Sequence, residues 1–391
     1  MRRATALAGV LLAAWCGLAA PAPAFHVDVP NPTKDKPQSK IWFAQGTWWA
    51  WMPVRGGSSI WRRTGTGWQR QTALDAVLAG LPGQADVWAD ESTARAVLVE
   101  PERLTVVGLR WDREAGRYRM DGRPTDFRMP PRSPKEKGIE TATITRDTQG
   151  RWWIAYDWRE DMWVRSWSGK DGDDWSAPLA VNRTKAEEDD ICSVVALPDR
   201  VGVIWSDQRA DAVYFRWHMD AAPPESWGPT ETVDHGGLTA DDHVHTAVAP
   251  DGTLYVATKN SVDTVGRPQL VLRTRDPLGK WTNTGYAVRT EIYQPSRPIV
   301  LLADSPARLF LLHSMYRMDH PVPEQSTIVW QAASLPHPDV AGAAPALLDA
   351  GSRLNDVTGP KANLRAGQVW IVLASDHKGD VYEAHLNSDG R

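Results

Sequence analysis

A pattern that recurs about every fifty residues runs through most of this chain. A short apolar or alternating run follows each of six positions, which are spaced by 54, 50, 52, 55 and 59 residues: Asp86, Glu140, Asp190, Asp242, Arg297 and Asp356. A fixed period of this length is typical of propeller blades and solenoid units. The chain is therefore expected to fold as a series of similar units rather than around one irregular core.

The unit that starts at Asp190 shows the plan of one repeat. Three short runs, at 191–197, 201–205 and 212–217, are separated by turn residues, as expected for three strands. The third run leads into a turn whose last residue is aromatic and opens a fourth strand, and this turn recurs at 67–68, 116–118, 172–175, 226–227 and 279–281. Four strands per unit predict an all-β fold, a β-propeller of about seven four-stranded blades, with six or eight blades left open.

The first 24 residues have the layout of a secretory signal peptide. Arg2 and Arg3 precede an apolar run at 4–20, and Ala22-Pro23-Ala24 supplies small residues for cleavage. We expect residues 1–24 to be removed on export, which makes the protein secreted or periplasmic. Residues 25–40 should cross the surface, where they could lend a strand that closes the ring, and residues 41–391 should form the propeller. No later stretch approaches 18 apolar residues, so no membrane span is expected.

Composition narrows the choice of partner. The formal charge of −4 falls to −6 without Arg2 and Arg3, and no stretch is rich in Lys and Arg, so a nucleic acid partner is not expected. The chain has 21 Trp against 5 Phe. Most of these Trp should be packing residues that recur in each unit, but those in loops can stack on sugar rings. We expect a carbohydrate ligand, a monomeric protein and no organic cofactor.

Two turns of the repeat resemble a motif of sialidase-like propellers. That motif, the Asp-box Ser/Thr-x-Asp-x-Gly-x-x-Trp, occupies the turn between the third and fourth strands. Two stretches keep its spacing with one residue displaced: Ser168, Asp171, Gly172 and Trp175 in the first, and Thr274, Asp276, Gly279 and Trp281 in the second. The chain is thus similar to exported propellers of the sialidase-like or BNR-repeat group. The resemblance implies the fold but not the activity, because sialidases use three arginines on the substrate carboxylate and only Arg297 is an arginine among the repeat starts.

In a propeller, the innermost strands begin at one face of the central channel, and the loops between second and third strands open on that face. The repeat starts should therefore surround one mouth. We predict Asp190 and Asp242 as the acid and base of a glycoside hydrolase, because carboxylates held together away from water acquire different pKa values. Substrate contacts are predicted for six residues of the mouth and its loops: Glu140, Trp158, Asp207, Lys259, Arg297 and Asp356.

Other readings of the same residues remain open. His243 or Tyr316 could remove a proton beside a uronate carboxylate that Arg297 neutralises, which is the chemistry of a glycan lyase. A non-catalytic glycan-binding or cell-envelope interaction protein would need only the aromatic rim, and a protein-binding scaffold is a third class. The carboxylates could also simply accept backbone hydrogen bonds. No zinc spacing is present, although a structural calcium ion on the acidic ring is possible.

Overall fold

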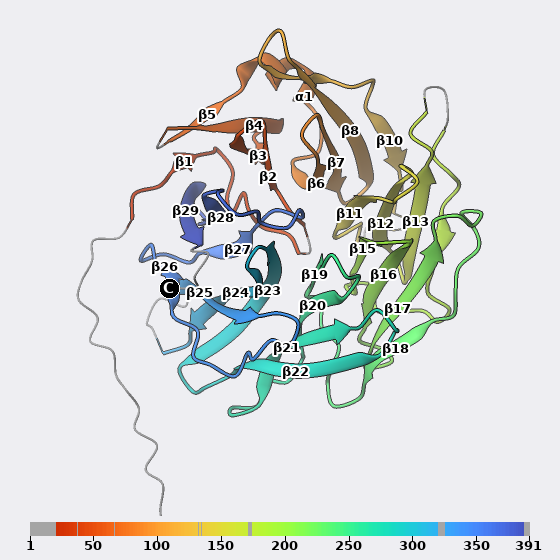
Figure 1. The fold of residues 1–391 in the computed structure, drawn as a ribbon, viewed down its shortest axis with the longest axis vertical. Helices are drawn as coiled ribbons and strands as arrows, with labels where there is room; N and C mark the ends of the chain where they lie inside the picture. The colour runs from red at the N-terminus through yellow and green to blue at the C-terminus, as the bar shows by residue number, and fades with distance from the viewer. Residues whose placement is uncertain are drawn as a thin grey trace, which may run out of the picture.

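Seven antiparallel sheets surround a central axis in the computed structural model, which describes residues 21–36, 38–65, 67–131, 133, 135–170, 174–319 and 325–386 (Figure 1). Each sheet is one blade, and the chain passes from blade to blade in order around the ring. The predicted all-β propeller is therefore confirmed, and the blade count is seven. Residues 1–20, which carry most of the predicted signal peptide, lie outside the described residues.

Each blade is built from strands that follow one another along the chain, from the axis to the rim. Blade one consists of β2 (Ile41–Ala44), β3 (Thr47–Val54), β4 (Gly57–Thr64) and β5 (Gly67–Arg70), and blade two of β6 (Gln84–Ala89), β7 (Thr93–Glu100), β8 (Arg103–Asp112) and β10 (Thr125–Arg128), with β9 (Arg117–Met120) also paired with β8. Blade three consists of β11 (Ala142–Arg146), β12 (Trp152–Trp158), β13 (Asp161–Trp167) and β14 (Leu179–Ala180). Blade four consists of β15 (Cys192–Leu197), β16 (Arg200–Asp207), β17 (Ala212–Met219) and β18 (Glu231–His235).

The last three blades follow the same plan. They consist of β19 (Val244–Val248), β20 (Leu254–Lys259), β21 (Pro268–Arg275) and β22 (Trp281–Val288); β23 (Tyr293–Asp304), β24 (Ala307–Arg317), β25 (Ser326–Ser334) and β26 (Ala346–Leu348); and β27 (Asn355–Thr358), β28 (Trp370–Ser375), β29 (Asp380–Leu386) and β1 (Phe25–His26). The stretch 326–348 thus supplies the outer strands of blade six.

The core lies between neighbouring sheets. The described apolar side chains form six buried clusters, and together these join every pair of adjacent blades. Trp49, Trp153 and Trp205 come from second strands of different blades and are almost completely buried. Burying such large side chains supplies much of the apolar area that stabilises the ring. Many of the tryptophans are therefore packing residues, as the sequence suggested.

The N-terminal segment completes the ring. Strand β1 pairs with β29, with Phe25 opposite Val381 and His26 opposite Asp380, so the first strand of the described chain is the outermost strand of the last blade. This is the closing strand considered from the sequence. The segment then turns toward the axis, where Thr33, Gln38, Ser39 and Lys40 are buried rather than on the surface. Gln38, Ser39 and Lys40 hydrogen-bond to the inner strands of blades three, two and seven, so residues 38–40 fill part of the central channel.

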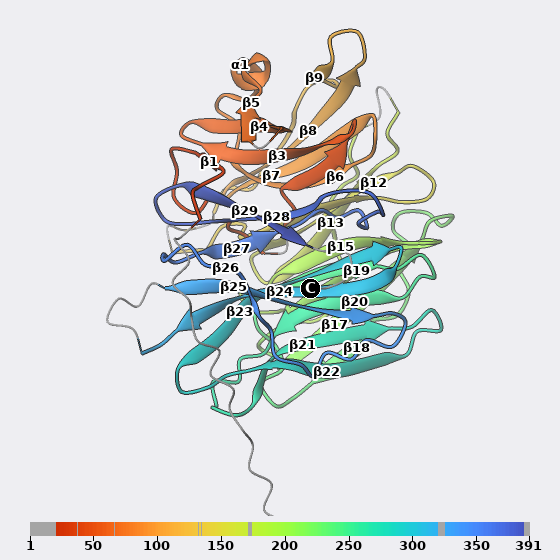
Figure 2. The same cartoon turned by 60° about the vertical axis from the view of Figure 1, so that its left-hand side comes forward.

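The few helical residues in the described chain link blades one and two. Thr72–Leu74 form a 3-10 turn, and α1 (Asp75–Leu78) follows it and packs against β4 on the outside of the ring (Figure 2). None of the described helices has the length and apolar character needed to cross a bilayer.

Some strand starts differ from the predicted pattern. The fourth strands of blades three and four begin at Leu179 and Glu231, several residues after the predicted aromatic openings at Trp175 and Trp227. The reason is that each of these residues first packs its ring against another tryptophan, Trp175 against Trp167 and Trp227 against Trp153. The chain becomes extended only after these contacts.

The two Asp-box-like turns can be followed only in part. In the second, the Asp276 carboxylate accepts a hydrogen bond from the Lys280 N–H at 2.8 Å, directly before β22. In the first, Asp171 and Gly172 lie outside the described residues. The turns therefore sit between third and fourth strands, and the propeller is established without the sialidase-like type.

Candidate active site

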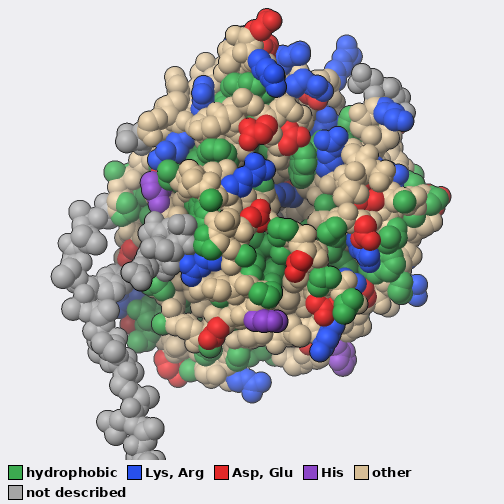
Figure 3. Space-filling model, viewed as in Figure 1, with side chains coloured by type: hydrophobic (Ala, Val, Ile, Leu, Met, Phe, Trp, Pro, Cys, Tyr) green, Lys and Arg blue, Asp and Glu red, His purple; other side chains and the backbone are tan. Residues whose placement is uncertain are grey.

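The starts of several inner strands meet at one opening of the channel, called here the channel mouth. Its members come from the N-terminal segment and from blades three, five, six and seven: Lys36, Glu140, Asp241, Asp242, His243, Lys259, Arg297, Tyr316 and Asp356. Figure 3 shows the face seen in Figure 1, on which acidic and basic side chains lie around the centre of the ring. Seven of the ten residues predicted for the site are members of the channel mouth.

Lys36 joins two of the predicted carboxylates. Its ammonium group lies 3.6 Å from Glu140 and pairs directly with Asp242. Burial raises the pKa of Glu140, and the charge of Asp242 adds to this effect against the opposing charge of Lys36. Burial alone would raise the pKa of Asp242 as well, but the hydrogen bond and charge of His243 hold it well below its usual range. The pKa of Glu140 is thus raised and that of Asp242 is lowered, as an acid and base pair requires.

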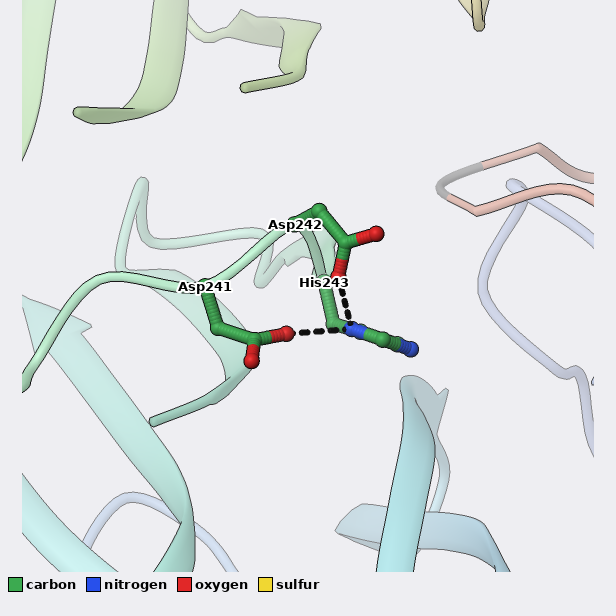
Figure 4. A group of neighbouring side chains, drawn as sticks. All are labelled: Asp241, Asp242 and His243. Atoms are coloured by element: carbon green, nitrogen blue, oxygen red, sulfur yellow. Dashed lines mark hydrogen bonds and ion pairs between the residues drawn. The ribbon is translucent and has the colours of Figure 1, made fainter. Parts of the chain in front are cut away.

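His243 is held between two carboxylates (Figure 4). Its Nδ1 lies 2.6 Å from an Asp241 oxygen and 2.7 Å from an Asp242 oxygen, and its Nε2 points away from both. Nε2 is buried and has no hydrogen-bond partner among the described residues. Asp241 also pairs with Lys259 at 2.5 Å. The imidazole therefore fixes the positions of the two carboxylates and, through Asp241, of Lys259.

Asp241, Asp242 and His243 are also the described residues best placed to hold a metal ion. Each offers one ligand atom, and these atoms lie within 4.8 Å of one another. However, Lys36 and Lys259 already pair with the two carboxylates, so a bound cation would have to displace an ammonium group. The calcium ion considered from the sequence stays a prediction.

Arg297 and Asp356 form an ion pair between blades six and seven. One guanidinium nitrogen of Arg297 lies 2.9 Å from both oxygens of Asp356, and its Nε donates to the Tyr316 hydroxyl at 2.8 Å. Burial opposes the charge of Arg297, but the adjacent Asp356 outweighs it and raises the pKa of the guanidinium. Both paired residues have left-handed φ angles, 55° and 40°, which is uncommon for residues other than glycine and is often found at functional sites.

A cavity opens beside this pair. Its volume is about 330 Å³, and its lining includes Lys259, Arg297, Tyr316, Arg317 and Arg353. Arg353 lies over the Tyr316 ring, 5.0 Å from its centre, and has no ion pair with a carboxylate among the described residues. The cavity, called here the basic cavity, therefore combines cationic side chains with one phenol and suits a ligand that carries negative charge.

Asp190 and Asp207 do not join this group. The Asp190 carboxylate accepts hydrogen bonds from the backbone N–H groups of Glu187 and Gln208, and the residue is only 1% exposed. Asp207 is also buried and accepts from the Ala210 N–H at 2.8 Å. No hydrogen bond or ion pair joins Asp190 to Asp242 in the described chain. Both residues thus have the backbone-binding geometry that the sequence left open as an alternative to catalysis.

Trp158 and Asp86 also lie in other settings. The Trp158 ring is half-buried, with the guanidinium of Arg159 3.9 Å from its centre. Asp86 is the third residue of β6, and it accepts hydrogen bonds from the backbone of Ser39 and Ile144. It also pairs with Lys361 and has no hydrogen bond or ion pair with a member of the channel mouth among the described residues, so its predicted position at the mouth is wrong.

Three members of the site were not predicted from the sequence. Lys36 precedes Asp86 by about one repeat length, so the repeat itself could have indicated it. Asp241 belongs to an acidic doublet of which only the second residue was chosen. Arg353 lies in the connection between β26 and β27, where no periodic signal marks it.

Comparisons with known proteins bear on the fold. No protein-family model matches the chain, and no curated protein is significantly similar to it. Among solved structures, a protein from Lactobacillus plantarum superposes with a TM-score of 0.52 at 15% identity, covering 88% of each chain. An α-L-arabinanase of Penicillium chrysogenum matches at 0.45 and 11% identity over 75% of this chain and 94% of its own, and the Aleuria aurantia lectin at 0.42 and 12% over 64% and 77%. At 15% identity, the similarity to the Lactobacillus plantarum protein supports the fold alone.

Proposed function

We propose that this protein is a carbohydrate-active propeller that binds an acidic glycan in the basic cavity and cleaves it by elimination. The observation that carries the proposal is the meeting of three predicted site residues in one cavity. Lys259, Arg297 and Tyr316 come from different strands of two blades, yet all line the same space. Cations beside a phenol are what elimination next to a carboxylate needs.

The sugar carboxylate would bind to the cations of the basic cavity. Asp356 occupies one nitrogen of Arg297 and Tyr316 faces its Nε, which leaves the second terminal nitrogen for the ligand. Arg353, which has no carboxylate partner in the described chain, supplies a further donor. Neutralising the carboxylate acidifies the proton on the adjacent carbon, because the negative charge that develops there can spread onto the carboxylate oxygens.

Tyr316 is placed to transfer that proton. In this step Tyr316 acts as a phenolate: its oxygen takes the proton, the electron pair of the broken C–H bond forms a carbon–carbon double bond, and the bond to the leaving oxygen breaks. The phenol then passes this proton to the leaving oxygen, which restores the phenolate, so no other reagent is consumed. Arg297 donates to the phenolic oxygen and can stabilise negative charge on it during the transfer, while the Tyr316 hydroxyl donates to Asn355 at 3.2 Å. His243 is buried between two carboxylates, so we give it a positioning role instead.

Replacing Tyr316 tests this mechanism. We expect the purified protein to generate ultraviolet-absorbing unsaturated ends from a uronate-containing polysaccharide, and Tyr316→Phe to reduce the rate at least about 100-fold, because the proton acceptor is lost. Tyr293→Phe, on the neighbouring strand, is the matched control and should keep the rate. Full activity in Tyr316→Phe would exclude the proposed mechanism, and binding without cleavage would favour a glycan-binding protein.

Hydrolysis is a second candidate, favoured by the opposite pKa shifts of Glu140 and Asp242. In that case Glu140 is the general acid and Asp242 the base or nucleophile. New reducing ends would appear without ultraviolet absorbance, and Glu140→Gln and Asp242→Asn should each slow their release by about 100-fold or more. Glu291→Gln, an exposed carboxylate outside the mouth, serves as the control. Equal reducing-end release by all three variants would remove this candidate.

A further inference from the structure

A second cavity lies away from the channel mouth, between blades two and three. Its volume is about 360 Å³, within the range of small-molecule sites, and it shares no lining residue with the basic cavity. We call it the rim pocket, because β10, the outermost strand of blade two, contributes to its wall. Its main lining side chains are Arg95, Arg110, Asp121, Phe127, Trp167 and Trp175.

Aromatic rings form one wall of the rim pocket. Trp167 and Trp175 stack with their ring centres 6.0 Å apart, and Phe127 meets Trp175 edge-on at 5.9 Å. Arg95 lies over Trp167 and Arg165 over Phe127, whereas Trp175 is partly buried and lines the pocket, so its ring is the one that a ligand can pack against. A flat aromatic surface of this kind packs against the C–H face of a sugar ring and buries apolar area without needing a charged partner.

Fixed polar groups form another part of the lining. Arg95 is held between Trp152 and Trp167, with its guanidinium 4.7 and 4.5 Å from the two ring centres, and it is only 8% exposed. Asp121 lies 3.4 Å from Arg95 and 3.0 Å from Arg110. The carboxylate and the guanidinium groups thus offer acceptors and donors side by side, which matches neighbouring sugar hydroxyls.

Two side chains of the lining also carry a buried donor without a partner. The Nε of Arg95 and the indole N–H of Trp167 are buried without a hydrogen bond to any described residue. Burial lowers the pKa of Arg95 to about 10, although Asp121 opposes this. Buried donors are normally satisfied, so these two are exceptions among the residues that line the rim pocket.

We propose that the rim pocket binds one hexose unit of a glycan, with the sugar face on Trp175 and neighbouring hydroxyls on Asp121 and Arg95. Asp121 offsets the charge of the arginines beside it, so the pocket suits a neutral sugar rather than an acidic one. The proposal does not depend on the elimination reaction. It gives the protein an anchoring site for the same polymer at a distance from the channel mouth.

Binding of neutral sugars tests the rim pocket. Titration calorimetry would use a panel of methyl glycosides and neutral oligosaccharides of glucose, galactose and mannose, with the Tyr316→Phe protein, so that failure of the catalytic proposal leaves the result intact. We expect at least one probe to bind, and Trp175→Ala to weaken its binding about tenfold or more because the stacking surface is lost.

Trp281→Ala is the matched control. Trp281 occupies the corresponding turn of blade five, where it packs on Phe215 and donates to Glu231. The Trp281→Ala protein should keep sugar binding even if its melting temperature falls as far as that of the Trp175→Ala protein. Asp121→Asn, which leaves the platform intact, should also weaken binding. The proposal is wrong if no probe binds, or if Trp281→Ala weakens binding as much as Trp175→Ala.

Discussion

Side chains of three inner strands tie their blades to the next blade through backbone amides. Asp86 accepts from the Ile144 N–H, Thr143 from the Val194 N–H, and His245 from the Val300 N–H, at 2.7, 2.8 and 3.3 Å. The acceptors differ chemically, but they occupy corresponding places in blades two, three and five. The ring is therefore held at its centre by hydrogen bonds as well as by the apolar clusters between sheets.

His245 makes this arrangement sensitive to acid. Burial, with the nearby charge of Lys361, lowers the pKa of His245 to about 3, and its Nδ1 must stay unprotonated to accept from Val300. Because the folded pKa lies below the unfolded value of about 6.5, the unfolded chain takes up the proton first. The contribution of His245 to stability is thus fully present above about pH 6.5 and is lost as the pH falls toward 3.

His245→Thr should remove part of this acid sensitivity, because Thr143 makes the equivalent bond in blade three. The free energy of unfolding should fall between pH 7 and pH 4 in both proteins. We expect this fall to be smaller in His245→Thr than in the wild type by roughly 1 to 3 kcal/mol. Urea unfolding at several pH values measures this. His313, also buried and with a pKa lowered to about 3, is left in place, so some acid sensitivity should remain. Parallel pH profiles for the two proteins would contradict the assignment.

At the scale of elements, β1 is the shortest strand of its blade but carries a large side chain. Phe25 is 8% exposed and stacks on Trp61 of blade one, with ring centres 4.5 Å apart. It therefore joins the last blade to the first through packing as well as through the β1–β29 hydrogen bonds.

Phe25→Ala should weaken this junction. We expect a loss of about 2 to 4 kcal/mol in the free energy of unfolding, because a buried aromatic ring is removed from a packed cluster. Denaturant unfolding checks the value. Leu278→Ala, at a side chain that is 95% exposed, is the control and should change stability by less than about 0.5 kcal/mol. A Phe25 variant as stable as this control would mean that β1 contributes little to closure.

The elements that the sequence predicted best are those whose pattern is local. Inner and second strands alternate in polarity and end at turn residues, so the unit after Asp190 was read with errors of one or two residues. Outer strands depend on contacts with the neighbouring blade. The packing of Trp175 and Trp227, for example, delays the start of the fourth strand, and no local pattern records it.

At the scale of the whole molecule, the repeat predicted which residues approach the axis but not which of them contact each other. Lys259, Arg297 and Tyr316 do meet, because adjacent blades bring the starts of their inner strands and the ends of their second strands together. Asp190 also lies at the start of an inner strand, yet its carboxylate accepts hydrogen bonds from the backbone of its own blade. The orientation of a side chain at a strand start depends on which amides lie within reach, and a period of fifty residues carries no information about that.

The strand that completes the last sheet is the first strand of the described chain, and this has a consequence for synthesis. The ring cannot close until β29 has been made, so a nascent or prematurely terminated chain presents β28 as an open edge and leaves β1 without its partner. Such an edge is a template for pairing with a second molecule. Loss of one short C-terminal stretch should therefore yield an aggregating product rather than a slightly smaller propeller.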